Sequence, residues 1–162
     1  MSSYTLSSGL RRFRAGWKTC LSQSIIAGLT TILILLFLNL EHAVVIAALG
    51  ASAFIVFGRP FDLTARPYNV IGGHLVGFAA GSLCAMVPHS SLFATLVCYG
   101  MAVGISVFLM VVVNMQHPPA SATALGMAIR GYSAESLIAV LTITLVLSFV
   151  HYVLKPHLRN LF

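Results

Sequence analysis

Long apolar stretches alternate with short polar breaks along this chain. Several stretches are long enough, at ~1.5 Å per residue, to cross a membrane core of ~30 Å, and others are apolar but too short to cross unaided. The full-length helices are predicted at residues 19–39, 70–87, 92–113 and 135–154, and the short ones at 43–57 and 119–129. The pattern therefore predicts an all-α integral membrane protein with about six helical segments.

Composition supports the membrane class and excludes a soluble domain. The chain is 59% hydrophobic and only 7% charged, whereas soluble proteins carry about 25% charged residues. The net charge of +6 is interpreted as a topology signal and as contacts with lipid headgroups, so no nucleic-acid partner is expected. The three cysteines show no motif spacing, which indicates neither a disulfide framework nor a metal site.

Basic residues define the ends of the predicted domain. Residues 1–18 are interpreted as a basic amphipathic segment at the interface, anchored by Trp17, and 19–155 as the transmembrane domain. Residues 156–162 form a short tail. Six crossings would place nearly every basic residue, and both termini, in the cytoplasm, with Arg130 on the other side. If 119–129 is instead re-entrant, five crossings result and this charge bias weakens.

The two halves of the chain show an approximate repeat. Asn39-Leu40-Glu41-His42 resembles Asn114-Met115-Gln116-His117, and each precedes a short segment with small residues. This gives an inverted repeat of three plus three segments, an arrangement typical of transporters whose site lies at the repeat interface. The alternative is chance similarity, because Asn-x-x-His is a weak match.

One stretch, 114–126, combines polar residues, two prolines and small residues within an apolar context. Pro118 and Pro119 suit the first positions of a helix. The backbone N–H groups of Ala120 and Ser121, with the hydroxyls of Ser121 and Thr123, would form an anion site at the helix start. In the alternative interpretation, the prolines only start a helix and the hydroxyls bond to carbonyls one turn earlier.

The charge balance favours an anion or a neutral solute over a cation. The acidic residues Glu41, Asp62 and Glu135 all lie at segment ends, whereas a cation pathway would need buried carboxylates. Arg66 and Arg130 are candidates for attracting anions at membrane depth. The alternative for Arg130 is that its side chain extends to the interface.

The histidines offer further chemistry. A proton relay through His42, His74 or His117 is one option, because histidine titrates near neutral pH. Haem ligation would need facing histidines at matched depth, and no spacing indicates it. The chain has no catalytic triad, phosphate-binding loop or HExxH motif, so we expect neither an enzyme nor a bound metal or cofactor.

Three ordered blocks of sequence resemble the HPP family of integral membrane proteins. The blocks are His117-Pro118-Pro119-Ala120-x-Ala122-Thr123-Ala124-Leu125, Gly50-Ala51-Ser52-Ala53 with Phe57-Gly58-x-Pro60, and Ala65-x-Pro67-x-Asn69 with Gly73-His74. The resemblance implies a small transporter-like domain, and plastid and cyanobacterial relatives are associated with nitrite transport. The chain departs from the family at Ser121, which is usually glycine, and at Arg66, where the basic residue stands two places early.

The resulting hypothesis is a permease or channel for a small inorganic monovalent anion, nitrite first. Its expected substrate-binding residues are His42, Gly50, Ser52, Arg66, Asn69, His74, Asn114, His117, Pro118, Pro119, Ala120, Ser121, Thr123 and Arg130. The alternatives are a non-transporting membrane partner or sensor subunit and, more weakly, a haem or quinone protein. We expect a homo-oligomer in the bacterial inner (plasma) membrane, contacted by lipid.

Overall fold

The computed structural model describes residues 6–36 and 43–161, with side chains from 16–36 and 47–161. Within these ranges every regular element is a helix, as the apolar pattern predicts. The α-helices are α1 (Leu6–Leu35), α2 (Ala43–Gly58), α3 (Pro67–Ala85), α4 (Leu92–Val112), α5 (Ala120–Arg130) and α6 (Ala134–Leu154). Short 3-10 turns, η1 (Leu63–Ala65) and η2 (Lys155–His157), follow α2 and α6.

Helix lengths agree with the prediction of four long and two short segments. α2 has 16 residues and α5 only 11, while the other four have at least 19. Three of the long helices are apolar enough to be candidate membrane spans, namely Gly16–Leu35, Leu92–Val112 and Ala134–His157. α3 is not among them, because polar residues such as Asn69 and His74 lower its mean hydropathy.

Several element boundaries differ from the sequence-based prediction for identifiable reasons. α1 begins at Leu6 and is kinked at Gly16, so the predicted interfacial segment and the first span form one bent helix. It ends at Leu35, short of the predicted Asn39, and residues 37–42 lie outside the described part. α3 begins at Pro67 rather than at residue 70, because proline suits the first helical position.

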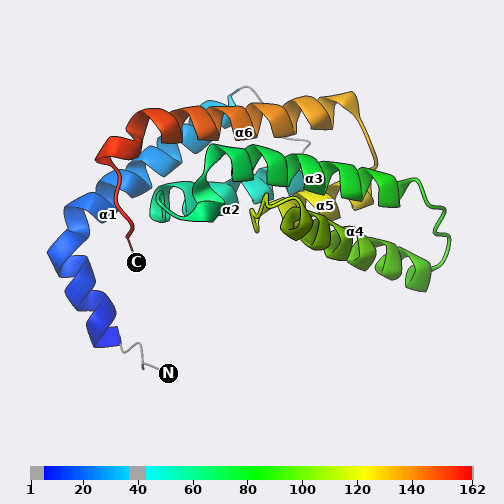
Figure 1. Cartoon of the computed structure of the whole chain (residues 1–162), viewed down its shortest axis with the longest axis horizontal. Coiled ribbons are helices and arrows are strands. Elements are labelled where there is room, and N and C mark those ends of the chain that lie inside the picture. Colours follow the sequence, from blue (N-terminus) through cyan, green and yellow to red (C-terminus); the bar gives the residue numbers. More distant parts are fainter. Residues whose placement is uncertain (1–5, 37–42, 162) are drawn as a thin grey trace.

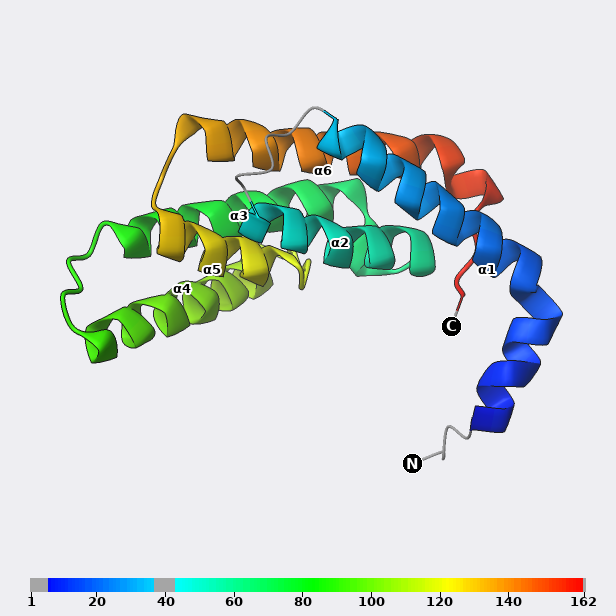
Figure 2. The same cartoon turned by 180° about the vertical axis from the view of Figure 1, so that it is seen from behind.

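α3 is the centre of the bundle. It packs against α6 on one side and against α4 and α5 on the other (Figure 1). α4 contacts α3 and α5 and is otherwise peripheral, while α1 packs on α2 and α6 (Figure 2). The apolar core lies between α1, α2, α3, α5 and α6 and includes Leu49, Phe57, Met127, Ile143 and Leu147.

Glycines of α3 allow α5 to pack closely against it. A Cβ at Gly77 would overlap the carbonyl of Ala120, and one at Gly81 would overlap the carbonyl of Ala124. The spacing of Gly73, Gly77 and Gly81, with a small residue at every fourth position, predicts such close packing, and the structure shows it at Gly77 and Gly81. In a membrane such packing matters because lipid is as apolar as the helix surface, so close contact takes the place of the hydrophobic effect.

Successive helices alternate in direction, so both described ends of the chain lie at one end of the bundle (Figure 1). At that end the C-terminal segment packs on the loop after α2. The Leu161 N–H donates to the Gly58 carbonyl at 2.9 Å, and the Phe61 N–H donates to Asn160 Oδ1 at 3.2 Å. The loops before α4 and α6 lie at the opposite end.

Candidate functional site

Four buried polar side chains meet where α2, α3 and α5 converge. They are Ser52 on α2, His74 on α3, His117 in the loop before α5, and Thr123 on α5. None is more than 2% exposed. We call these four residues the histidine cluster. All four belong to the substrate-binding set expected from the sequence, although they come from three separate parts of it.

Hydrogen bonds connect the histidine cluster into a chain. Ser52 Oγ lies 2.9 Å from His74 Nε2 and 2.9 Å from His117 Nε2, so the hydroxyl bridges the two rings. The other ring nitrogens also have partners: His74 Nδ1 lies 2.8 Å from Thr123 Oγ1, and His117 Nδ1 lies 2.7 Å from the Thr64 carbonyl. The ring centroids are 5.0 Å apart.

The loop before α5 brings His117 into place. Asn114 has φ 55°, a left-handed conformation that asparagine tolerates, and it ends α4. The following Met115 N–H donates back to the Met110 carbonyl at 2.8 Å, which completes the helix stop. Gly73 then lets the loop approach α3, because a Cβ there would lie 2.8 Å from His117 Cβ. Asn114 therefore has a structural role in turning the chain.

Asn69 fixes the same loop from α3. Its side chain is 1% exposed, and its Nδ2 donates to the Gln116 carbonyl at 3.2 Å. Gln116 Oε1 is buried and has no hydrogen-bond partner among the described residues. Asn69 thus lies beside the histidine cluster, as expected, but acts here on the loop backbone.

The start of α5 is internally hydrogen-bonded. The Ala120 N–H donates to the His117 carbonyl at 2.9 Å, and the Ser121 N–H donates to the Pro118 carbonyl at 3.1 Å. The Ser121 hydroxyl also donates to the Pro118 carbonyl, at 2.7 Å. The Ser121 hydroxyl thus matches the alternative in which hydroxyls bond one turn back, whereas the Thr123 hydroxyl faces His74. An anion at this helix start would have to displace the Ser121 bond and the two amide bonds. Pro119 is buried and Pro118 is exposed.

Three other expected residues are exposed, whereas the histidine cluster is buried. Gly50 and Arg66 are exposed, and no atom outside its own helix lies within 4 Å of a Cβ built at Gly50. Arg130 is exposed at the far end of α5. His42 lies outside the described residues.

The two histidines of the cluster are placed too closely to ligate one haem. Both Nε2 atoms lie within 2.9 Å of the same serine oxygen, which leaves no room between the rings for a porphyrin. The geometry instead suits exchange of protons among neutral and charged imidazoles and a hydroxyl. The structure groups no three potential metal ligands among the described residues.

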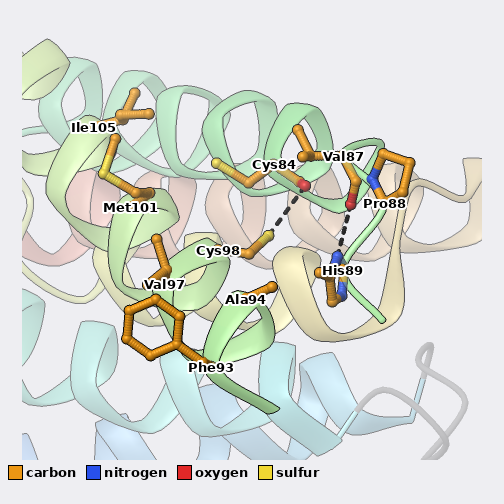
Figure 3. A pocket seen from close by; sticks show the side chains of 10 residues that line it. All are labelled: Cys84, Val87, Pro88, His89, Phe93, Ala94, Val97, Cys98, Met101 and Ile105. Atoms are coloured by element: carbon orange, nitrogen blue, oxygen red, sulfur yellow. Dashed lines mark hydrogen bonds between the residues drawn. The ribbon is translucent and has the colours of Figure 1, made fainter. Parts of the chain in front are cut away.

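Two hollows lie elsewhere on the bundle. One, of about 500 Å³, is bounded by the end of α3 and the start of α4 and lined mainly by apolar side chains (Figure 3). In it, the Cys98 thiol donates to the Cys84 carbonyl at 3.1 Å, and His89 Nδ1 donates to the Val87 carbonyl at 2.6 Å. The other, of about 280 Å³, lies between α1, α2 and the C-terminal segment, beside Gln23.

The sequence did not predict two groups that hold the polar interior in place. The Thr64 carbonyl orients His117, but a backbone oxygen in a turn leaves no residue-type signal. Gln23 is 1% exposed, and its Nε2 donates to the carbonyls of Phe57 and Arg159. A lone glutamine inside an apolar run was the available signal, because a polar side chain at membrane depth needs partners.

The fold and this site define the class: a polytopic helical membrane protein with a buried polar centre. The chain belongs to the HPP family, whose family model, described as "HPP, transmembrane region", matches residues 10–160.

Curated relatives agree with the membrane class and add no activity. Two Dictyostelium discoideum proteins, each named a transmembrane protein, are 37% identical over 62% of this chain and 32% identical over 52% of it. The aligned regions make up 37% and 27% of those proteins, so this chain spans about a third of the curated relatives' length. No solved structure matches.

Proposed function

We propose that the protein is a membrane transport protein, a permease or channel, that passes a small inorganic monovalent anion through the α2–α3–α5 junction. The observation that carries this proposal is the histidine cluster. Four polar side chains are buried at the centre of an apolar helix bundle, and polar groups at such depth commonly mark a solute or ion pathway.

The charge balance supports an anion. Nine basic residues stand against three acidic ones, and the histidine cluster contains no carboxylate. The short α5 beside longer helices also resembles the broken helices that form transporter sites. Nitrite is the first candidate because of the family resemblance, which is an argument by analogy. The bacterial inner (plasma) membrane and a homo-oligomeric state are part of the same proposal, and no catalytic activity is included in it.

Uptake into proteoliposomes tests the proposal. Vesicles containing the purified protein should take up nitrite. The uptake rates of nitrate, formate and chloride, measured in the same way, give the selectivity. Thr123→Val removes a cluster hydroxyl without changing volume much. Loss of a hydrogen bond worth about 1 kcal/mol should slow uptake several-fold.

Thr144→Val is the matched control. Thr144 is equally buried, at 0% exposure, but its hydroxyl bonds only carbonyls of its own helix, α6. Its uptake should equal that of the unmodified chain. If the folded protein passes none of the four anions under any imposed gradient, the transport proposal fails.

A non-transporting membrane partner or sensor subunit is the second candidate. It is favoured by the complete burial of His117 and by the saturated hydrogen bonds at the start of α5. This candidate predicts that the folded protein gives no flux of any of these anions in the vesicle assay.

A further inference from the structure

The Thr64 carbonyl fixes the tautomer of the neutral His117 ring, and the directions of the other bonds follow when Ser52 donates to that ring. A carbonyl only accepts, so His117 Nδ1 must carry the hydrogen that it donates to Thr64. In the neutral ring, Nε2 then accepts, and its partner Ser52 must donate to it. The serine oxygen has lone pairs left, so His74 Nε2 donates to Ser52 and His74 Nδ1 accepts from Thr123. The two neutral rings therefore hold opposite tautomers.

Ser52 has a second acceptor available. Its Oγ also lies 2.9 Å from the Ala48 carbonyl, one turn earlier in α2. The hydroxyl has a single hydrogen, so it can donate to Ala48 or to His117 but not to both.

This choice gives the cluster a place for one additional proton. When a proton binds His117 Nε2, that nitrogen becomes a donor to Ser52 Oγ. The Ser52 hydroxyl then rotates and donates to the Ala48 carbonyl, while His74 still donates to Ser52. Every hydrogen bond of the cluster survives the change, so the added charge leaves no polar atom unpaired.

The surroundings limit the cluster to one such proton. A second charge on His74 would repel the first, because the rings are only 5.0 Å apart. No described carboxylate faces either ring to offset it. Asp62, in the loop after α2, pairs with Arg59 at 2.9 Å. Glu135 lies in the first turn of α6, at the opposite end of the bundle from that loop. The neighbouring polar groups on α3 and α5 are neutral: Thr123 bonds His74, and Asn69 bonds the Gln116 carbonyl beside His117.

We propose that the histidine cluster is a proton-binding centre that takes up a single proton through Ser52, so that the transported anion crosses together with a proton. The coupling rests on the transport function proposed above, whereas the proton-binding centre itself does not. The cluster has no fixed positive charge, so the bound proton supplies the charge that balances an entering anion. The anion and the proton then cross together with no net charge.

The tautomers provide a test that needs no transport. The full chain, labelled with ¹⁵N-histidine and placed in lipid nanodiscs, is examined by NMR. We expect His117 as the Nδ1–H tautomer and His74 as the Nε2–H tautomer at neutral pH, with signals assigned by His74→Gln and His117→Gln. Acidification should convert one ring of the pair to imidazolium, not both. The same tautomer on both rings, or two imidazoliums forming together, would overturn the centre.

Coupling is tested by measuring anion uptake and internal pH in the same proteoliposomes. Nitrite uptake above that of protein-free vesicles should be driven by a pH gradient, bring protons with it, and be unaffected by a membrane potential set with valinomycin. Uptake driven by the potential alone, without proton movement, would overturn the coupling. Absence of any uptake would instead contradict the transport function. The tautomer measurement would then still test the proton-binding centre on its own.

Ser52→Ala removes the bridging hydroxyl. It should abolish the acceleration by the pH gradient and shift the histidine tautomers. Ser148→Ala is the matched control, since Ser148 is a buried serine of α6 whose Oγ has no hydrogen-bond partner in the described structure. It should behave as the unmodified chain. Equal pH responses of the two variants would contradict the role of Ser52.

Discussion

Several buried polar side chains in this bundle bond to backbone carbonyls of other segments. His151 Nε2 donates to the Pro60 carbonyl at 2.9 Å, and Gln23 joins α1 to the end of α2 and to Arg159. Carbonyls at the ends of helices lack intrahelical partners, and lipid supplies none. A buried side chain that reaches them therefore stabilises a junction that the apolar surfaces alone would leave open.

Gln23→Leu tests this at one residue. Its amide satisfies the carbonyls of Phe57 and Arg159 and accepts from the Arg159 N–H at 2.9 Å. Each backbone group left unsatisfied costs about 1–3 kcal/mol, so we expect a clearly lower melting temperature in detergent and faster proteolysis after residue 154. Ser22→Ala is the control, because the Ser22 hydroxyl is exposed and bonds only Thr19. Equal melting temperatures for the two variants would contradict a stabilising role of Gln23 at this junction.

At the scale of elements, α3 and α5 form the tightest pair, and their contact positions the histidine cluster. His74 lies one turn before Gly77 on α3, and His117 lies three residues before Ala120, which Gly77 faces. A change in the distance between these helices would therefore move the two histidine rings relative to each other. The packing of α3 against α5 therefore determines the geometry of the histidine cluster.

Gly77→Ala should separate α3 from α5. Its methyl group meets a backbone carbonyl, which cannot rotate away, so overpacking should cost about 1–3 kcal/mol and reduce nitrite uptake. Gly104→Ala is the matched control, because its Cβ on α4 would have no neighbour within 4 Å. Thermal unfolding and uptake are measured for both. A Gly77 variant as stable and active as the Gly104 variant would show that the α3–α5 contact is less restrictive than the structure indicates.

The sequence predicts elements better than it predicts which residues meet. Apolar runs and prolines locate α2 to α6 to within three residues, because length and N–H loss are local properties, whereas α1 begins well before the predicted span. The sequence predicts Ser52, His74 and His117 as site residues, yet their bridging arrangement depends on how α2, α3 and the loop before α5 meet. Gly50 is predicted together with Ser52 because the two are close in sequence, but residues two apart on a helix face different sides, and Gly50 is exposed.

Over the whole molecule, charge and topology are consistent. The described basic residues Lys18, Arg59, Arg66, Lys155 and Arg159 belong to the segments at the end of the bundle where both chain ends lie, and Arg130 ends α5 on the other side. α5, with 11 residues, spans only ~16 Å at ~1.5 Å per residue, so it cannot cross the membrane core alone. α6 nevertheless begins at the end opposite the one where α3 begins, because α5 and the loop that follows it complete the passage.

The positive-inside rule then predicts which end faces the cytoplasm, and cysteine labelling can test it. In a chain with Cys20, Cys84 and Cys98 replaced by alanine, Ser90→Cys and His157→Cys each introduce one exposed thiol, at opposite ends of the bundle. A membrane-impermeant maleimide applied to intact cells should label position 90 at once and position 157 only after permeabilisation, because the basic end is held inside. The reverse pattern would invert the orientation. Labelling of both positions from outside would mean that α5 turns back within the membrane, so that α6 ends on the outer side.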